Sequence, residues 1–206
     1  MRLSAEKKRE IHERILKGAG RLFRAEGYEG VSLDDVMQAA GLTRGAFYAH
    51  FGSKAELFRE VVRAERPMLR MLRERPGPDA DALWEQMLAL VAGYLDPKNL
   101  EAVYAGCTAA ALTGDAARAP EPVRAAYEAA FADMLDEIAR GQDGADRDLL
   151  AAALTLASGA VNTAASCADA AARRQVLKAA WKGVSELLRL ARGDAAGDHG
   201  KNGATD

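Results

Sequence analysis

The chain has 206 residues, of which 49% are hydrophobic and 28% are charged, with 19 glycines and 6 prolines. This composition excludes a disordered chain and is typical of a globular protein that can bury a sizeable core. The net charge of −2 excludes a strongly basic protein. Residues 1–60 nevertheless hold 11 basic against 9 acidic side chains, and this excess would orient the molecule on DNA. The basic run at residues 7–9 alone is better explained as a solvated surface.

Scarce β-branched residues and abundant alanine after about residue 79 predict an all-α fold. Its first element is a long helix that begins at Ser4 or Ala5 and ends at Gly27, because glycine can leave a helix with a positive φ. One face of this helix carries a hydrophobic stripe at Ile11, Ile15, Ala19, Leu22 and Phe23. We expect this stripe to support the two helices that follow.

A short second helix is predicted between Ser32 and Gly41. Hydrophobic residues recur there with helical spacing at Leu33, Val36, Met37 and Ala40. Ser32 can cap the helix, and Asp35 three residues later completes a capping box. Gly41 supplies the positive φ that ends it.

A third helix follows the turn at Gly41. Thr43 can cap it, and Phe47 and Phe51 lie four residues apart on one side. Its other faces carry Arg44, Gly45, Tyr48 and His50. Two short helices across a tight glycine turn form a helix-turn-helix, in which the second helix presents its side chains to the DNA major groove.

The connection to the rest of the chain begins at Ser53, which forms a second capping box with Glu56. Pro67 should kink or end this helix, and residues 75–78, Arg-Pro-Gly-Pro, form the clearest break. We predict an N-terminal three-helix DNA-binding domain over residues 1–60, a helical body over 61–192 and a disordered tail over 193–206.

The body is predicted to contain five further helices. They cover about residues 79–95, 100–117, 123–138, 145–167 and 169–192. The fourth of these is crowded with Ala, Ser and Gly, which lets helices approach closely. The fifth repeats large apolar residues at Leu177, Trp181, Val184 and Leu188.

The two cysteines, Cys107 and Cys167, form neither a metal-ligand pattern nor a disulfide framework. The N-terminus lacks a secretory apolar segment, and the longest apolar run, Leu149 to Val161, is too short to span a bilayer. We therefore expect a soluble cytoplasmic protein with no cofactor and no membrane partner. The three histidines, at positions 12, 50 and 199, are dispersed, so no catalytic arrangement is predicted.

The candidate DNA-binding residues are Ser32, Thr43, Arg44, Gly45, Tyr48, His50 and Lys54. Arg44 has the geometry to contact guanine O6 and N7, the commonest specific base contact. Tyr48 and His50 can each donate one hydrogen bond to a phosphate. Thr43 and Lys54 lie at helix starts, where backbone N–H groups favour anions. Alone, His50 would more often be an ordinary surface histidine, and only the whole set favours the phosphate role.

The stretch ILKGAGRLFRAEGYEGVSLDDVMQAAGLTRGAFYAHFGSKAELF carries a specific cluster, Phe47-Tyr48-x-His50-Phe51-x-x-Lys54. From Arg9 to Leu57 the chain resembles the DNA-binding domain of the TetR/AcrR transcriptional regulators. Two positions depart from that family pattern. Met37 replaces a small alanine at the helix crossing, so the two helices are expected to pack slightly apart. Ala49 replaces a long polar side chain, so one potential DNA contact is absent.

The resemblance implies a homodimer, formed by the last two helices of each chain, that binds a palindromic double-stranded DNA operator. It also implies a pocket between the kinked connector and the body for a small apolar or amphipathic effector, most simply one that releases a repressor. Residues 61–192 would then be a ligand-binding and dimerisation domain. Over these residues the resemblance is limited to the order of the helices.

The candidate pocket residues are Trp84, Met87, Tyr94, Cys107, Tyr127 and Phe131, although each alone is more simply explained as core. Cys107 follows Gly106 near a predicted helix start, where a thiol can become reactive. A repressor that senses electrophiles or oxidants is therefore an alternative, and a small buried hydrophobe is the simpler interpretation of Cys107. An all-helical enzyme and a helical adaptor are further alternatives. The sequence lacks the clustered ligands that such an enzyme would need, and the predicted recognition helix is an argument against an adaptor.

Overall fold

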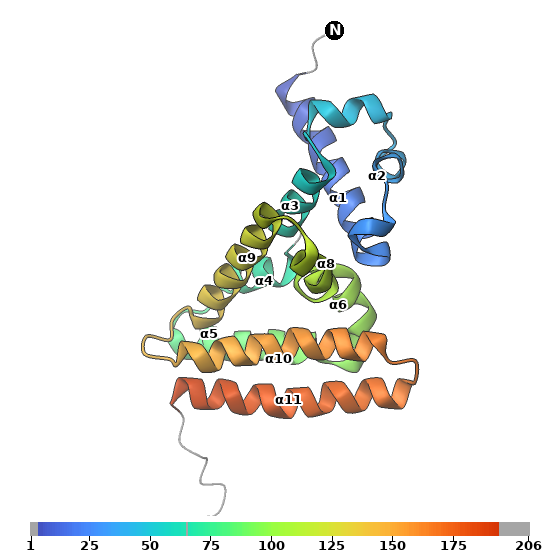
Figure 1. Cartoon of the computed structure of the whole chain (residues 1–206). Coiled ribbons are helices and arrows are strands. Elements are labelled where there is room, and N and C mark those ends of the chain that lie inside the picture. Colours follow the sequence, from blue (N-terminus) through green and yellow to red (C-terminus); the bar gives the residue numbers. More distant parts are fainter. Residues whose placement is uncertain (1–3, 65, 194–206) are drawn as a thin grey trace, which may run out of the picture.

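The computed structural model describes residues 4–64 and 66–193, in which all regular elements are helices, as predicted. The elements are α1 (Ala5–Gly30), α2 (Leu33–Ala39), the 3₁₀ helix η1 (Arg44–Ala49), α3 (Lys54–Ala64), α4 (Pro67–Arg73), α5 (Ala80–Tyr94), the 3₁₀ helix η2 (Pro97–Asn99), α6 (Leu100–Gly106), α7 (Thr108–Ala111), α8 (Thr113–Arg118), α9 (Glu121–Ala139), α10 (Arg147–Ser166) and α11 (Ala170–Arg192). Figure 1 shows α1–α3 at one end of the molecule, with α9 leading down to α10 and α11 at the other.

Helix α1 begins where the sequence predicts. The Lys7 N–H donates to the Ser4 hydroxyl at 3.2 Å and caps the first turn. Gly27, with a φ of 75°, interrupts the helix, although helical turns continue to Gly30. The predicted stripe faces inward: Leu22 is half-buried, and the buried members are Ile11, Ile15, Ala19 and Phe23.

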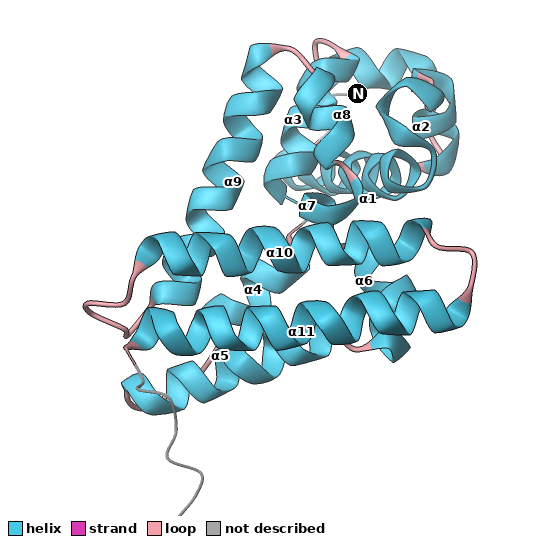
Figure 2. Ribbon diagram, turned by 60° about the horizontal axis from the view of Figure 1, so that its bottom comes forward, coloured by secondary structure: helices cyan, strands magenta, loops and turns pink. Residues whose placement is uncertain are grey.

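The hydrophobic core of the N-terminal unit, α1 to α3, continues into the body. Helix α3 packs against α9, and Figure 2 shows α7 and α8 beside the same unit. The body residues that join its core are Leu112, Ala119, Val123 and Ala126. The helical body therefore packs directly against the N-terminal unit.

The connector breaks at the predicted proline. Helix α3 ends at Ala64, and Pro67 is the first residue of α4, where its missing N–H costs no helical hydrogen bond. Arg66, directly before it, has the non-helical angles φ −125° and ψ 69°. Clash with the proline ring disfavours helical angles at this position, so the chain changes direction here.

The second predicted break, after α4, is held by a buried arginine. Arg75 donates to the carbonyls of Leu72 at 2.9 Å and Leu83 at 2.7 Å, and also to that of Glu137. Burial lowers the pKa of Arg75, with the charge of Arg140 adding to the effect. These bonds connect the end of α4 to α5 and α9 and so fix the positions of these three helices relative to one another.

Helices α10 and α11 lie side by side along their length (Figures 1 and 2) and agree with the ranges predicted for the last two helices. Helix α10 contributes small buried side chains, namely Ala153, Ala157, Ala160 and Ala164. Helix α11 contributes Leu177, Ala180, Val184, Leu188 and Ala191. The small residues of one helix admit the large residues of the other, so the pair forms one side of the body core with α5 and α9.

By length and composition alone, α10 could cross a membrane, contrary to the expectation drawn from its apolar run. Its most apolar window has a mean hydropathy of 1.4, and 33% of that window is buried. Packing against α11 accounts for the buried side as protein core. On the remaining side of α10, Leu156 is exposed.

The helix predicted over residues 100–117 is divided into α6, α7 and α8, which corrects the prediction. The chain leaves helical geometry at Cys107, with φ −96° and ψ 103°, and at Leu112, with φ −110° and ψ 11°. Tertiary contacts favour the breaks over a continuous helix. Leu112 is fully buried in the N-terminal core, and the Asn162 amide of α10 donates to the Ala110 carbonyl at 2.6 Å.

Helix α11 ends at Gly193, which has a left-handed φ of 82°. The disordered tail predicted over residues 193–206 lies, apart from Gly193, outside the described residues.

Candidate nucleic-acid interface and adjoining cavity

The capping box predicted at the start of α2 is present. The Asp35 N–H donates to the Ser32 hydroxyl at 3.2 Å, and the Ser32 N–H donates to the Asp35 carboxylate at 2.8 Å. The Ser32 hydroxyl also donates to this carboxylate at 2.5 Å, and these bonds lower the pKa of Asp35. Ser32 is exposed, but its hydroxyl is already engaged within the cap.

The turn after α2 forms at the predicted glycine. Gly41 has a φ of 65°, and its N–H donates to the Gln38 carbonyl at 2.9 Å. The Leu42 N–H donates to the Met37 carbonyl at 2.8 Å, and the Arg14 guanidinium of α1 donates to the Ala40 carbonyl. The C-terminal carbonyls of α2 are thereby satisfied, which fixes the direction in which the chain leaves the turn.

Within residues 43–50, the recognition segment, Arg44–Ala49 form the 3₁₀ helix η1 rather than the predicted α-helix. The Ala46 N–H donates to the Thr43 carbonyl at 3.0 Å, and the His50 N–H donates to the Phe47 carbonyl at 2.9 Å. The Thr43 side chain forms no capping bond, contrary to the prediction. A run of six residues is longer than the three or four usual for a 3₁₀ helix, which winds more tightly than an α-helix.

Two buried rings hold the recognition segment on the core. Phe47 and Phe51 are buried with ring centroids 5.7 Å apart, as their spacing predicts. The opposite face is exposed, and it carries Thr43, Arg44, Gly45, Tyr48 and Ala49. Tyr48 is 62% exposed, the highest value among the large hydrophobic side chains of the described residues. An aromatic ring held in solvent beside an arginine is typical of a binding surface.

Arg44 is oriented by an acidic neighbour at the start of α2. Its Nη1 atom lies 2.7 Å from Oδ2 of Asp34, and the two side chains are 59% and 62% exposed. Exposed ion pairs contribute about 0.2–1 kcal/mol. A phosphate or a base edge can therefore replace Asp34 as the partner of Arg44 at small cost.

His50 and Lys54 flank the exposed face and are both half-buried. The Lys54 ammonium lies 4.4 Å from the centroid of the Tyr28 ring, a cation–π contact. Burial of the His50 ring lowers its pKa, and the charges of His12 and Lys8 lower it further. His50 is therefore mostly neutral at pH 7 in the free protein.

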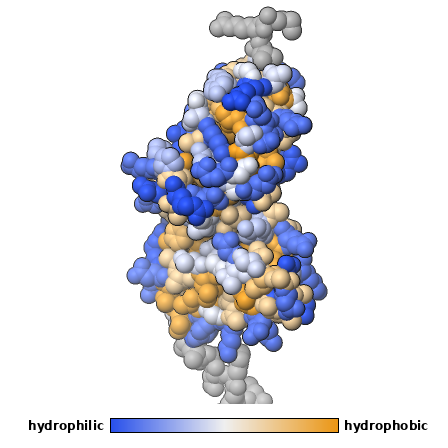
Figure 3. Space-filling view, turned by 45° about the vertical axis from the view of Figure 1, so that its right-hand side comes forward, coloured by the Kyte–Doolittle hydropathy of each residue, from blue (hydrophilic) through white to orange (hydrophobic). Residues whose placement is uncertain are grey.

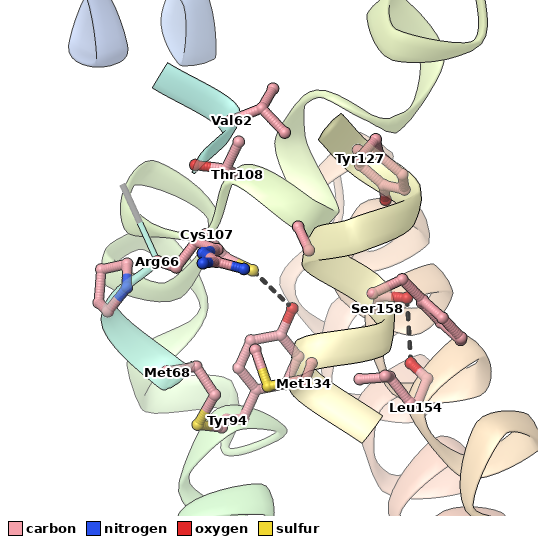
Figure 4. A pocket seen from close by; sticks show the side chains of 13 residues that line it. Val62, Arg66, Met68, Tyr94, Cys107, Thr108, Tyr127, Met134, Leu154 and Ser158 are labelled. Atoms are coloured by element: carbon pink, nitrogen blue, oxygen red, sulfur yellow. Dashed lines mark hydrogen bonds between the residues drawn. The ribbon is translucent and has the colours of Figure 1, made fainter. Parts of the chain in front are cut away.

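Three adjoining cavities lie in the body, and Met68 and Tyr94 line all of them. Their volumes are about 60, 330 and 40 Å³. The first lies between the connector and α5, α9 and α10 (Figure 4), and the second is bounded by α4, α5 and α6. A flexible methionine between them can repack, so the cavities can join around a larger molecule.

Four of the six candidate pocket residues line the first cavity, namely Tyr94, Cys107, Tyr127 and Phe131. The other two do not. Trp84 and Met87 are buried in the body core at 3% and 0% exposure, and the Arg192 guanidinium of α11 lies 5.4 Å from the centroid of the Trp84 ring. Trp84 thus faces α11, and both residues are part of the body core rather than of the cavity lining.

The polar groups of the first cavity are few and paired. The Tyr94 hydroxyl and the Cys107 sulfur are 3.2 Å apart, drawn as a dashed line in Figure 4. Burial raises the pKa of Tyr94 well above its usual value, with Cys107 adding to the effect. The Tyr127 hydroxyl lies 2.9 Å from the Thr113 hydroxyl. A ligand would thus meet apolar walls, a few hydroxyl groups, the Cys107 thiol and the side chain of Arg66.

Nine residues that line the first cavity were not predicted as pocket residues, although the predicted break at Pro67 could have indicated its two neighbours. Arg66 and Met68 flank Pro67 and line the first cavity, where Arg66 donates to the Asp133 carboxylate at 2.7 Å. Ser158 of α10 also lines the cavity but carries no local signal, because its hydroxyl only donates to carbonyls of its own helix.

The segment that lines the cavity also contacts α1. The Arg24 guanidinium donates to the Ala105 carbonyl of α6, and the Tyr28 N–H donates to the Asp115 carboxylate of α8 at 3.1 Å. Cys107 and Thr108, between these contacts in sequence, line the cavity.

Over residues 4–64 and 66–193, no three His, Cys, Asp or Glu side chains lie together as a metal site would require.

The profile of the bacterial regulatory proteins of the tetR family matches residues 15–61. The chain is 42% identical over 60 residues to the HTH-type transcriptional regulator AcrR of Shigella flexneri, covering 29% of this chain and 28% of that one. It is 34% identical over 95 residues to the uncharacterized HTH-type transcriptional regulator TtgW of Pseudomonas putida, covering 46% of this chain and 68% of the relative. The match to AcrR thus spans only about a quarter of that relative's length.

Solved structures agree over most of the chain. The reduced form of NemR from E. coli is 16% identical with a TM-score of 0.68, covering 86% of this chain and 96% of NemR. A TetR-family transcriptional regulator from Agrobacterium tumefaciens is 24% identical with a TM-score of 0.65, covering 85% and 97%. At these identities the likeness concerns the fold, and it extends through the helical body.

Proposed function

The chain belongs to the TetR family of bacterial regulatory proteins, and from this premise we propose that it is a transcriptional repressor that binds a palindromic DNA operator as a homodimer. A small apolar or amphipathic molecule in the body cavities lowers its operator affinity. The protein acts in the cytoplasm and is not an enzyme, in keeping with relatives that are all named as transcriptional regulators. The single observation that carries the proposal is the capped α2–η1 unit, which holds Arg44 and Tyr48 in solvent.

In the proposed complex the recognition segment enters the major groove. Arg44 leaves Asp34 and contacts guanine, because the exposed ion pair is weak and guanine offers two acceptors. Tyr48, His50 and Lys54 contact phosphates. The other predicted residues have indirect roles. Thr43 and Gly45 carry small side chains that leave the DNA-facing surface exposed, and Ser32 stabilises the start of α2 by capping it.

The proposed dimer forms through α10 and α11. Leu156 on α10 and Leu190 on α11 are 39% and 45% exposed, and only a third of the apolar window of α10 is buried. Orange and pale surface spreads over the body in Figure 3, whereas the N-terminal unit is mostly blue. A second copy covers such a face without requiring a membrane, and the two helix pairs then form a four-helix interface.

The effector occupies the cavities around Met68 and Tyr94. Apolar walls select an apolar molecule, and the paired hydroxyl and thiol groups accept one or two polar atoms. The first cavity, of about 60 Å³, is too small for a drug-sized ligand. Binding therefore displaces Met68 or moves Cys107 and Thr108, and this movement is what lets the ligand distinguish two forms of the protein.

A second candidate mechanism is covalent. Cys107 lines the cavity, and an electrophilic carbon that reached its sulfur would form a thioether and add bulk inside the same space. The helix start that the sequence predicts near Cys107 gives little support for a reactive thiol, because α7 has only four residues. The cavity and the neighbouring Tyr94 hydroxyl at 3.2 Å favour this candidate instead.

The test is selection of sheared genomic DNA from the source organism on the immobilised full-length protein. Enriched fragments should share an inverted repeat with half-sites about 34–36 Å apart, one helical turn. Arg44→Ala should cost about 1–3 kcal/mol and relax base preference, whereas Lys54→Ala should weaken all sequences and lower the salt slope by about one. Failure to enrich any fragment above random DNA, even at low salt, would refute the proposed function.

A further inference from the structure

An open cleft of about 420 Å³ lies where the first turns of α1 meet the end of the recognition segment. Its charged and titratable side chains are all basic: Lys8, Arg9 and His12 from α1, and His50 from the end of η1. The remaining lining residues are Ala5 and Ala49. No acidic side chain of the described residues lines it. A concave surface with four basic groups and no carboxylate is suited to an anion.

The two histidines are held close together by packing. The His12 ring stacks on Phe51, with centroids 4.6 Å apart and planes 22° apart. The His12 and His50 rings are 5.9 Å apart. The Nδ1 atom of His50 is buried and has no hydrogen-bond partner among the described residues. Both rings are therefore positioned by packing, and the Nδ1 atom of His50 has capacity for another hydrogen-bond partner.

The charges around His50 all oppose its protonation in the free protein. Its pKa is lowered by burial and then by the positive charges of His12 and Lys8, and no carboxylate counters them. Arg9 also lines the cleft, and its guanidinium lies 3.9 Å from Glu13 on the outer face of α1. An anion bound between these groups would place a negative charge beside His50 and so favour its imidazolium form.

We propose that this cleft binds one backbone phosphate of DNA, and that the histidine pair takes up a proton as the phosphate enters. The inference rests on the proposed function, because the phosphate belongs to the duplex read by the recognition segment. That source is favoured by position: Ala49 and His50 of the cleft directly follow Tyr48, which projects into solvent on the DNA-facing side. Helix α1 thereby becomes part of the DNA interface.

The sign of the resulting pH dependence follows from linkage. Phosphate stabilises the protonated form of His50, so the pKa of His50 is higher in the complex than in the free protein. DNA binding then takes up a proton, and affinity rises as the pH falls from neutral toward the lowered pKa of free His50. Below that pKa both states are protonated and the gain levels off.

The test measures binding by fluorescence anisotropy with a duplex of about 30 base pairs of arbitrary sequence, since phosphate contacts do not depend on sequence. Between about pH 8 and 5.5, at constant ionic strength, wild type should gain about tenfold in affinity for one proton taken up. The double variant His12→Asn/His50→Asn should lose this gain, and His199→Asn, which removes the remaining histidine, should keep it. An equal gain in the double variant would overturn the proposal.

A second measurement does not depend on how the variants fold. Imidazole proton NMR of wild type should report a higher His50 pKa with the duplex than without it, and an unchanged pKa would overturn the proposal. Inorganic phosphate alone, at the same phosphate concentration, should leave the His50 titration unchanged, and a matching shift would mean that the cleft takes free phosphate instead. Failure of wild type to bind any duplex at any pH would instead refute the proposed function itself.

Discussion

Asp34→Asn should strengthen DNA binding while weakening the fold. In the free protein Arg44 is paired with Asp34 at 2.7 Å, with both side chains about 60% exposed, so the pair is worth about 0.2–1 kcal/mol. DNA must break this pair in each protomer. Removing it should therefore improve the affinity of a dimer by about 0.4–2 kcal/mol, which is roughly 2- to 30-fold.

The cost to the fold follows from the place of Asp34 in the first turn of α2. A carboxylate there stabilises the helix by about 0.3–1 kcal/mol, and the ion pair is lost as well. For a domain of this size each 1 kcal/mol lowers the Tm by about 2–4 °C. Anisotropy titrations on a selected operator and thermal melts by circular dichroism should therefore move in opposite directions.

Asp35→Asn is the matched control, because it removes the same charge from the same turn of α2 without touching Arg44. The Asp35 carboxylate binds Ser32 instead. This variant should therefore lose stability, and its DNA affinity should rise at most by the amount that removing one negative charge near the DNA contributes. The reasoning is refuted if Asp34→Asn and Asp35→Asn change affinity equally. A loss of affinity in Asp34→Asn would mean that Asp34 itself contacts the DNA.

Three further variants test other parts of the structure. Leu156→Glu should sediment as a monomer and lose operator binding. Met71→Glu, which charges a somewhat more exposed residue outside α10 and α11, should remain a dimer. A dimeric Leu156→Glu would exclude the proposed interface. Ser32→Ala should cost about 1 kcal/mol and lower the Tm by about 2–4 °C, and an unchanged Tm would show that the cap is not needed. If the sensor is covalent, Cys107→Ser should resist operator release by a thiol-reactive compound while Cys167→Ser responds like wild type; equal release of both would leave reversible binding as the mechanism.

The parts of the structure that the sequence predicted are those whose causes are local. Ser32 and Asp35 are three residues apart and satisfy each other's backbone groups. Gly41 turns the chain by its own φ, and Pro67 ends a helix by its own ring. The exposed face of η1 could also be predicted, because burying Phe47 fixes which neighbours remain outside. In each case the determinant and its effect lie within a few residues.

The parts that escaped prediction have partners far along the chain. Alanine-rich residues 100–117 favour one helix by propensity, but Leu112 is buried against the N-terminal unit and Asn162 binds the Ala110 carbonyl from 52 residues away. The sequence also did not indicate that Trp84 of α5 faces α11 while Tyr94 of the same helix faces α4. Such choices depend on which helices meet, and a pattern within one helix does not contain that information.

The breaks that the sequence missed also bear on the proposed response to ligand. Cys107 and Thr108 line the cavity, and on either side the same segment accepts hydrogen bonds from α1, at Ala105 and at Asp115. Hydrogen bonds to charged groups contribute about 1.5–3 kcal/mol each, so these two together are worth about 3–6 kcal/mol. Moving an equilibrium from 1:99 to 99:1 requires about 5.5 kcal/mol. Because the chain already leaves helical geometry at Cys107 and Leu112, we propose that an effector exchanges these two contacts without unwinding a continuous helix over residues 100–117.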